Sequence, residues 1–575
     1  MLGNIARIVG QFKQSWSREL DDDAIVQACR EAGHQWRERE LGPVATVKMF
    51  LLQILYGNVA CEFVPHLAGK EVTGSAYCAA RGRLPLAALQ TLLGRCTTQM
   101  AECVQNTGLW LGHRLFLLDG SSFSMPDEPE LQEHFGQSGG QAAGCGFPTA
   151  HWLALVHFGS GLFQKVLTAP LRTHDLNGVA QLHPELQAGD VALGDRAFGT
   201  YGHVALLVFR GLHGIFRAHQ KLIVNFTPGR PHIEPRRVRG KQHAGLPRSL
   251  WIQSLGPLDQ IVEWFRPEHV PAWLAAEAWA ALPEKLRVRE LRYTIARPGF
   301  RTHTVTLVTT LLDPVRYPKE KLAEAYGLRW TIETVFQHLK TTMKMDVLRC
   351  QTVRGIEKEL TMFLLVYNLV RMTMLEAARK QGVPPERISF VDALRWLATA
   401  QPGDELPALV VNPLRPGRVE PRVRKRRPKE YPLLKKPRAL LRQELTAQAL
   451  GAKLDAIHSR PLLFPRRASG GERSPVGPGY VPEHSGPIGF QRFPFAVRRK
   501  ENELRLARTG SPRNGPTGQT CEGALWPYEK NDAELGIFES VSGSRSFTYT
   551  EYHVPGEVRV RKDSFEGRES ALKCT

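Results

Sequence analysis

Closely spaced cysteines are missing from this sequence. Its nine cysteines are scattered over 575 residues, and no two of them form a Cys-x2-Cys pair. Thiolate zinc sites use such pairs, and small secreted domains use an even, regularly spaced set for disulfides. The sequence therefore argues against both kinds of site and predicts a protein of a reducing cytosol.

Long apolar runs and a leader sequence are missing as well. No run of eighteen apolar residues occurs, and the N-terminus lacks an apolar stretch followed by a small-residue cleavage site. We therefore expect neither a membrane span nor a signal peptide. The histidines have no His-Glu-x2-His motif or cysteine partner, which argues against catalytic zinc. A serine nucleophile at Ser121 or Ser122 would lack the Gly-x-Ser-x-Gly frame.

Positive charge, in contrast, is present in excess. The chain carries 76 Lys and Arg residues against 56 Asp and Glu, which gives a formal net charge of +20. Such a field favours a polyanionic partner, and nucleic acid is the commonest one. An incidentally basic soluble protein is the alternative. Because the hydrophobic content of 42% is ordinary, we expect most of the chain to fold.

The pattern of apolar residues divides the chain into several units. Residues 1–105 have helical periodicity and predict a helical N-terminal domain of a size that often binds DNA. Short apolar runs alternate with helices in residues 106–221, and long helices follow in residues 313–400. This alternation predicts an α/β fold. Residues 222–312 interrupt it with Pro-rich basic stretches and further strands, which indicates a β-rich insertion.

Individual elements can be placed within these units. The expected strands are 114–118, 149–158, 162–167, 190–194, 214–217, 286–296 and 302–312. The expected helices are 44–56, 84–104, 177–186, 201–210, 319–343 and 355–380.

The C-terminal part of the chain has a different character. Residues 401–445 form a basic segment whose Pro-rich stretch, 415–442, is either a solvated tail or a phosphate-binding arm. Residues 446–575 lose periodicity and are rich in Gly, Pro, Ser and Arg. We expect this extension to be mostly disordered.

Two aspartates follow short buried strands. Asp119 comes directly after the apolar run 114–118 and begins a predicted turn that includes Ser121 and Ser122. Asp195 comes directly after the run 191–194. Ligands bind at the carboxyl ends of strands in α/β sheets. Each aspartate alone is more readily explained as a turn former, but the repeated order of strand and then Asp favours a shared site.

A third carboxylate lies on a predicted helix with three other polar residues. The set begins at Tyr326, and the other members follow it at offsets of three, seven and fourteen residues: Arg329, Glu333 and Lys340. At about 100° per residue, all four side chains lie on one helix face. A solvated amphipathic helix also has a polar face. This mixture, however, suits a phosphate site: Arg329 can donate two hydrogen bonds, Lys340 supplies a point charge and Tyr326 supplies one hydroxyl.

The three carboxylates have the chemistry that phosphodiester cleavage and strand transfer need. Two divalent ions about 3.5–4 Å apart can activate the attacking oxygen and stabilise the leaving oxygen. Hard ions such as Mg²⁺ prefer oxygen ligands. We therefore predict that Asp119, Asp195 and Glu333 are both the metal ligands and the catalytic residues.

At these residues the chain resembles the DDE transposases of bacterial insertion sequences, in the insertion-sequence-four family. The resemblance rests on the stretches 118–127 and 194–198 and on Tyr-x2-Arg-x3-Glu-x6-Lys at 326–340, whose spacing matches the family's signature without a gap. The stretches 298–302 and 309–313 are similar in kind only. The similarity covers roughly residues 20–440.

The resemblance implies a fold, a cofactor and a reaction. The fold is a ribonuclease-H-like core with the insertion between the second and third carboxylates. The cofactor is Mg²⁺, with two ions expected and Mn²⁺ as a substitute. The reaction is hydrolytic cleavage at terminal inverted repeats, followed by attack of the 3′-hydroxyl on target DNA. The resemblance thus implies double-stranded DNA as the partner and a homodimer when two DNA ends are paired. It also implies a location at the nucleoid in a bacterial cytoplasm.

Three points stay open at this stage. In some relatives a flipped base stacks on an aromatic residue, and Trp251 or Trp264 can take that role, although tryptophans in a folded segment are more often core residues. A catalytically inactive DNA-binding remnant of a transposase is the main alternative function. A nuclease that cleaves without joining is the second alternative.

Overall fold

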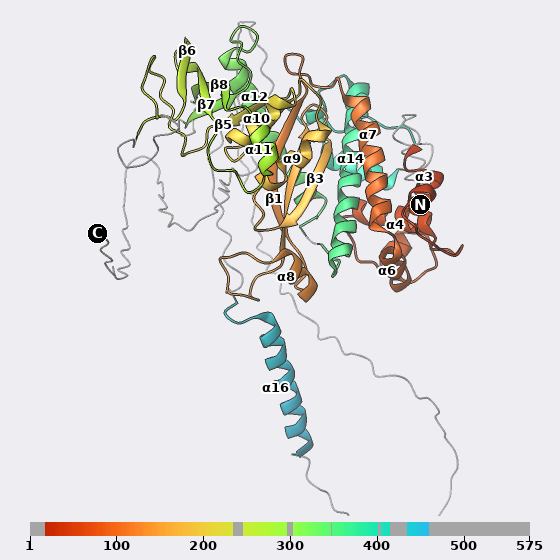
Figure 1. The fold of residues 1–575 in the computed structure, drawn as a ribbon. Helices are drawn as coiled ribbons and strands as arrows, with labels where there is room; N and C mark the ends of the chain where they lie inside the picture. The colour runs from red at the N-terminus through yellow and green to blue at the C-terminus, as the bar shows by residue number, and fades with distance from the viewer. Residues whose placement is uncertain are drawn as a thin grey trace, which may run out of the picture. The chain divides into compact units, whose positions relative to one another are not determined.

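A computed structural model describes residues 18–233, 245–295, 303–346, 348–400, 404–414 and 434–458 (Figure 1). The strands are β1 Leu115–Ser124, β2 Thr149–His157, β3 Phe163–Pro170, β4 Val191–Gly194, β5 His213–Arg217, β6 Leu250–Gly256, β7 Asp259–Phe265, β8 Lys285–Ile295 and β9 His303–Thr309. The longer helices are α3 Asp22–Glu31, α4 Pro43–Leu55, α6 Gly74–Arg83, α7 Leu86–Val104, α10 Tyr201–Phe209, α12 Lys319–Gly327, α14 Val353–Gln381, α15 Phe390–Thr399 and α16 Arg438–His458. The shorter ones are α5 Val64–Ala68, α8 Pro129–Phe135, α9 Leu176–Leu182, α11 Ala276–Ala281 and α13 Thr331–Gln337.

All of the described strands belong to one mixed sheet. Their order is β3-β2-β1-β4-β5-β9-β8-β7-β6. The neighbours β1, β4 and β5 run parallel, and every other neighbouring pair is antiparallel. The chain therefore has a mixed α/β fold, as the sequence predicts.

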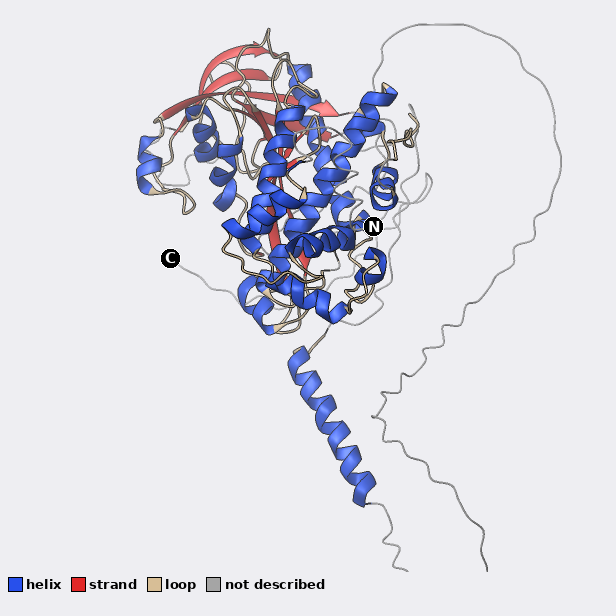
Figure 2. Cartoon of the chain, turned by 90° about the vertical axis from the view of Figure 1, so that its right-hand side faces the viewer, coloured by secondary structure: helices blue, strands red, loops and turns tan. Residues whose placement is uncertain are grey.

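The central strands are apolar because helices cover both faces of the sheet. Leu115 and Leu117 of β1 pack into one core, whereas Phe116 and Leu118 pack into the other. The N-terminal helices α3–α7 share the first core with α14 and α15, and α9 and α10 cover the second (Figure 1). Figure 2 shows helices on both sides of the strands. Burial on two faces explains why these strands are short continuous apolar runs.

The long helix α14 belongs to the first core. By length and composition it is apolar enough to cross a membrane, but 89% of its most apolar stretch is buried inside the protein. It packs against α7, α4 and α15. Its apolar character is thus what a central core helix requires.

Most of the expected elements are confirmed, and the structure adds two more. The hairpin β6–β7 is not among the expected strands, and it extends the sheet to one edge. Residues 446–458, at the start of the extension that we expect to be mostly disordered, continue the helix α16. Residues 298–302, 415–433 and 459–575 lie outside the described residues.

Two histidines are buried together in the second core. The Nε2 atoms of His183 and His203 lie 3.1 Å apart, and Nδ1 of His203 donates to the carbonyl oxygen of Phe198. Burial lowers the pKa of His203 to about 4. Burial and then the charge of His203 lower the pKa of His183 to about 2. Both side chains are therefore neutral in the folded protein at pH 7.

We expect mild acid to destabilise the protein through this pair. The unfolded chain takes up protons below the ordinary pKa of 6.5, but the folded chain takes up none at His203 until about pH 4. The stabilisation is complete above pH 6.5 and is lost as the pH falls towards 4; for one such histidine the loss is about 2 kcal/mol at pH 5. Urea denaturation at pH 7 and pH 5 measures it. The variant His203→Gln should lose less stability over this range, and equal losses would contradict the assignment.

Candidate active site

The two aspartates lie side by side at the carboxyl edge of the parallel strands. The register of β1 and β4 pairs Leu118 with Gly194, so Asp119 and Asp195 are the next residues on neighbouring strands. One detail of the sequence analysis is wrong: Asp119 and the residues after it form no turn. They continue β1 as far as Ser124, because β2 pairs with them along their whole length.

Asp119 is held by a hydrogen bond and an ion pair. Its Oδ1 accepts from the N–H of Gly120 over 2.9 Å, and its Oδ2 lies 3.0 Å from Nη1 of Arg329. Burial raises the pKa of Asp119 to about 7; the Arg329 charge opposes this rise, and the charges of Asp195 and Glu333 add to it. The two other carboxylates are thus close enough to repel the charge of Asp119.

Asp195 begins the chain segment after β4. Its Oδ1 accepts a hydrogen bond of 2.8 Å from the N–H of Ala197. Burial raises the pKa of Asp195, and the charge of Asp175 raises it further, against the opposing effects of this hydrogen bond and of Arg329. Arg329 is therefore the cation that both aspartates share.

The third carboxylate is on the segment 319–342, which is not the single regular helix that the sequence predicts. It consists of α12, a 3-10 turn at Leu328–Trp330, α13, and a π-helical turn at His338–Thr342. In the wide turn, the ring of His338 stacks on Phe390 of α15 with 4.2 Å between the ring centroids. Glu333 lies on α13 and is exposed.

The other residues of this segment also meet the strand edge. Tyr326 is buried, and Cζ of Arg329 lies 6.0 Å from the centroid of its ring. Nε of Arg329 is a buried donor without a hydrogen-bond partner in the described part of the chain. Lys340 reaches β1, where its Nζ donates to the carbonyl oxygen of Ser122 over 2.6 Å. The structure thus brings all six predicted site residues to one edge of the sheet.

Sequence reasoning missed one further residue at this edge. Gly194 of β4 pairs with Phe216 of β5, so Arg217 is the next residue in the row that begins with Asp119 and Asp195. The charge of Arg217 opposes the rise in the pKa of the buried Tyr326. Arg217 also ends a short apolar strand, and this strand-end position is the signal that could have found it.

The donor set suits a hard divalent ion. Asp119, Asp195 and Glu333 offer only oxygen ligands, which Mg²⁺ prefers. The like-charge repulsion at Asp119 is what a cation would relieve. Among the described residues, however, no group of three His, Cys, Asp or Glu side chains is arranged to hold one ion. Arg329 instead supplies the positive charge beside Asp119.

The two tryptophans of the insertion differ in their surroundings. Trp264 is 7% exposed, and its Nε1 donates to Glu290 over 3.2 Å. It is therefore a core residue and offers no stacking surface. Trp251 lies on β6 and is partly exposed.

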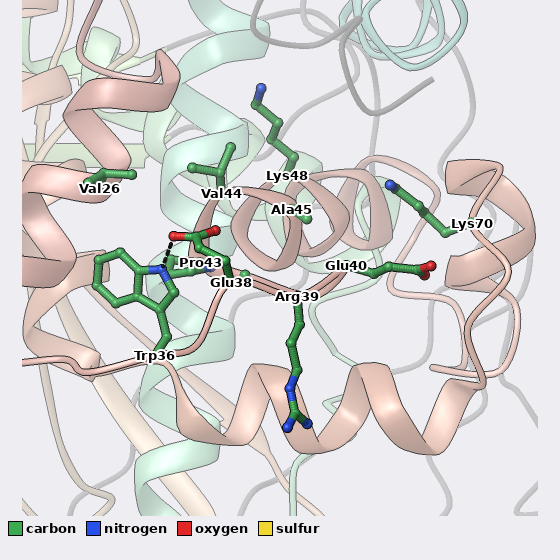
Figure 3. Close-up of a pocket in the computed structure, with 11 residues that line it drawn as sticks. Val26, Trp36, Glu38, Arg39, Glu40, Pro43, Val44, Ala45, Lys48 and Lys70 are labelled. Carbon is green, nitrogen blue, oxygen red and sulfur yellow. Dashed lines mark hydrogen bonds between the residues drawn. The ribbon is translucent and has the colours of Figure 1, made fainter.

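A separate pocket opens among the N-terminal helices, away from the elements that carry the carboxylates. It has a volume of about 300 Å³ and is lined by Trp36, Arg39, Lys48, Lys70 and two glutamates, among others (Figure 3). Nε1 of Trp36 donates to Glu38 over 3.1 Å, and Lys48 forms an ion pair with Asp22. Because acidic and basic side chains are mixed here, the pocket has no clear preference for an anion.

Comparison with known proteins gives consistent results for the segment that holds the site. Residues 110–369 match the family model described as "Transposase DDE domain". The chain is 26% identical, over 380 residues, to the transposase InsG for insertion sequence element IS4 of Escherichia coli strain K12. That alignment covers 63% of this chain and 78% of InsG.

Two further matches are weaker. The putative transposase InsZ of the same organism is 29% identical over 90 residues, which cover 16% of this chain and 30% of InsZ. Among solved structures, the piggyBac transposase synaptic complex with hairpin DNA matches 65% of this chain and 75% of that chain at 8% identity. Its TM-score of 0.35 is too low to establish a shared fold.

Proposed function

We propose that this chain, which matches the transposase DDE domain and resembles the IS4 transposase InsG, is a DDE transposase of the IS4 family. It would cut the DNA ends of an insertion sequence and join their 3′-hydroxyls to target DNA. The observation that carries the proposal is the row Asp119, Asp195 and Arg217 at one strand edge, with Glu333 close enough to repel Asp119. It supports a site for phosphoryl transfer. We further propose that β3-β2-β1-β4-β5 is the ribonuclease-H-like core.

The side chains at this edge would have different roles in the reaction. Asp119, Asp195 and Glu333 would hold two divalent ions, Mg²⁺ or Mn²⁺. When bound, these ions supply activation of the attacking oxygen and stabilisation of the leaving oxygen. Arg329 pairs with Asp119, and its charge also acts on Asp195. Its buried Nε–H would be left for an acceptor such as a phosphate oxygen.

The basic residues position the DNA backbone. Lys340 is anchored to the backbone of β1, so its charge stays beside the carboxylates. The net charge of +20 favours a polyanion over the whole chain. We propose double-stranded DNA as the partner, a homodimer when two ends are paired, and the bacterial cytoplasm as the location.

An assay on the element's own DNA ends tests this function. With Mg²⁺, the wild-type protein should nick the ends, leave 3′-hydroxyls and join them to a second DNA; with a chelator it should only bind. Binding without cleavage would favour the inactive remnant. Cleavage without joining, under conditions that support pairing of two ends, would favour the nuclease.

Arg217→Ala should weaken binding of the DNA ends. The guanidinium lies in the row of the two aspartates, where it can pair with a backbone phosphate. We expect the affinity for the DNA ends to be on the order of fivefold lower. The slope of the logarithm of affinity against the logarithm of salt concentration should fall by about the value of one phosphate contact. Titrations of labelled DNA at several salt concentrations measure both quantities. Arg217→Lys keeps the charge and should retain the salt dependence, and an unchanged slope in Arg217→Ala would contradict the contact.

A further inference from the structure

A histidine and an aspartate that have no role in the proposed site lie directly behind it. His151 is on β2, opposite Ser122 of β1. Asp175 lies at the N-terminal end of α9. Nε2 of His151 is hydrogen-bonded to Oδ1 of Asp175, and the two side chains are 17% and 22% exposed. The pair links β2 to α9 at the catalytic edge of the sheet.

Gly120 is the point where this pair meets the catalytic strand. A Cβ atom added at Gly120 would lie 2.6 Å from Oδ1 of Asp175 and 2.7 Å from Cε1 of His151. Real side-chain carbons do not approach so closely, so the pair occupies the space that any other residue would fill. Because successive residues of a strand face opposite ways, the pair lies on the side of β1 away from Asp119.

The same glycine holds the first carboxylate. The N–H of Gly120 donates to Oδ1 of Asp119 over 2.9 Å. Any shift of the Gly120 peptide therefore moves a hydrogen bond of Asp119. Asp175 also reaches the second carboxylate through its charge, which contributes to the raised pKa of Asp195. Both aspartates of the site thus have a physical connection to the pair.

We propose that His151 and Asp175 are positioning residues for the metal-binding carboxylates. His151 fixes Asp175, and the two together hold the Gly120 peptide in the place that orients Asp119. Partners of metal ligands commonly act in this way, and their loss costs about 10–100-fold in metal affinity or activity. The inference rests on the proposed function. A purely structural role, in which the pair only ties α9 to the sheet, would leave metal affinity unchanged.

The test uses His151→Ala, His151→Gln and Gly120→Ala in the full chain. His151→Ala leaves Asp175 without its partner, and Gly120→Ala pushes the pair away from β1. We expect each of these two to lower the cleavage rate at saturating DNA about 10–100-fold and to weaken Mn²⁺ binding about tenfold, with DNA affinity within about twofold of wild type. His151→Gln keeps a donor for Asp175 and should restore most of both quantities. Calorimetric titration with Mn²⁺ gives the metal affinity independently of cleavage.

A matched control is available on the neighbouring strand β3. The ion pair of Lys165 and Glu185, 3.0 Å long, also joins the sheet to the end of this helical segment, but it does not touch Gly120. Glu185→Gln should therefore leave metal affinity and cleavage unchanged. Thermal melting of all variants reports on folding, and the comparison of His151→Ala with His151→Gln provides a test even if Gly120→Ala does not fold.

The outcomes separate this inference from the proposed function. If wild type cuts DNA, Asp119→Ala does not, and both His151→Ala and Gly120→Ala behave like Glu185→Gln, the positioning role is wrong and the proposed function stands. A loss of melting temperature with unchanged Mn²⁺ affinity would equally overturn the positioning role. If wild type itself binds no Mn²⁺ and cuts no DNA end, both proposals fail.

Discussion

Asp195→Asn should lower the rate at which DNA ends are cleaved by about a thousandfold or more. DNA binding should stay intact. The amide keeps the shape of the side chain but removes a negative charge that a divalent ion needs as a ligand. The Arg329–Asp119 ion pair stays in place. Asp119→Asn and Glu333→Gln should lose cleavage to the same extent, because the three carboxylates would act as a unit.

The stability of Asp195→Asn supplies the internal control. In the folded protein, burial and the charge of Asp175 raise the pKa of Asp195 above its ordinary value. At pH 7 its charge therefore opposes folding, so a neutral amide should leave the melting temperature unchanged or higher. Glu324→Gln, on the neighbouring helix α12, is a second control because it removes a carboxylate that pairs with Lys321. This variant should cleave DNA ends at the wild-type rate. Normal cleavage by Asp195→Asn would show that the site is assigned to the wrong residues.

Asp259→Ala should cause the largest loss of stability, about 3–5 kcal/mol. Asp259 and Arg289 are 5% and 1% exposed, and two hydrogen bonds of 2.8 and 2.5 Å join them between β7 and β8. Arg289 also donates to the carbonyl oxygen of Tyr317 over 2.7 Å. Without Asp259 the guanidinium remains buried without the carboxylate that is hydrogen-bonded to it. Urea denaturation gives the free energy of unfolding.

The same two strands carry the control for this prediction. Glu263 of β7 and Lys285 of β8 lie 3.1 Å apart, and the lysine side chain is 58% exposed. Water screens that pair, so Glu263→Ala should cost at most about 1 kcal/mol. The double variant Asp259→Ala with Arg289→Met should recover part of the loss, because it removes the uncompensated charge. A loss for Asp259→Ala no larger than that for Glu263→Ala would contradict the argument.

Local patterns predicted the parts of the fold in which one residue type dominates. The strands β1, β4 and β5 are apolar because both faces are covered, and α14 is long and periodic, so the sequence indicates each of them. The sequence did not predict the hairpin β6–β7. All residues of β6 are at least partly exposed, and a Pro-rich stretch precedes this strand. The residues Gly120-Ser121-Ser122 have the composition of a turn, but their pairing with β2 keeps them extended.

The site was predictable where chemistry recurs at fixed spacing along the chain. The spacing of Tyr326, Arg329, Glu333 and Lys340 predicted one part of the candidate site, and the two strand ends at Asp119 and Asp195 predicted the other. The position of Arg217 depends on the register between strands, and the contact of His151 with Asp175 depends on how α9 packs. Neither pairing leaves a local pattern, so sequence reasoning alone did not reach them.

The path of the chain around β9 has an evolutionary consequence. The chain leaves the parallel strands after β5 and returns as β9 beside that same strand. The N–H of Ala218 already donates to the carbonyl oxygen of Thr306 over 2.8 Å, so the first and last residues of the detour are neighbours. A change in the length of this detour therefore need not stretch the strands that carry Asp119 and Asp195. Selection can act on the detour while those strands stay fixed.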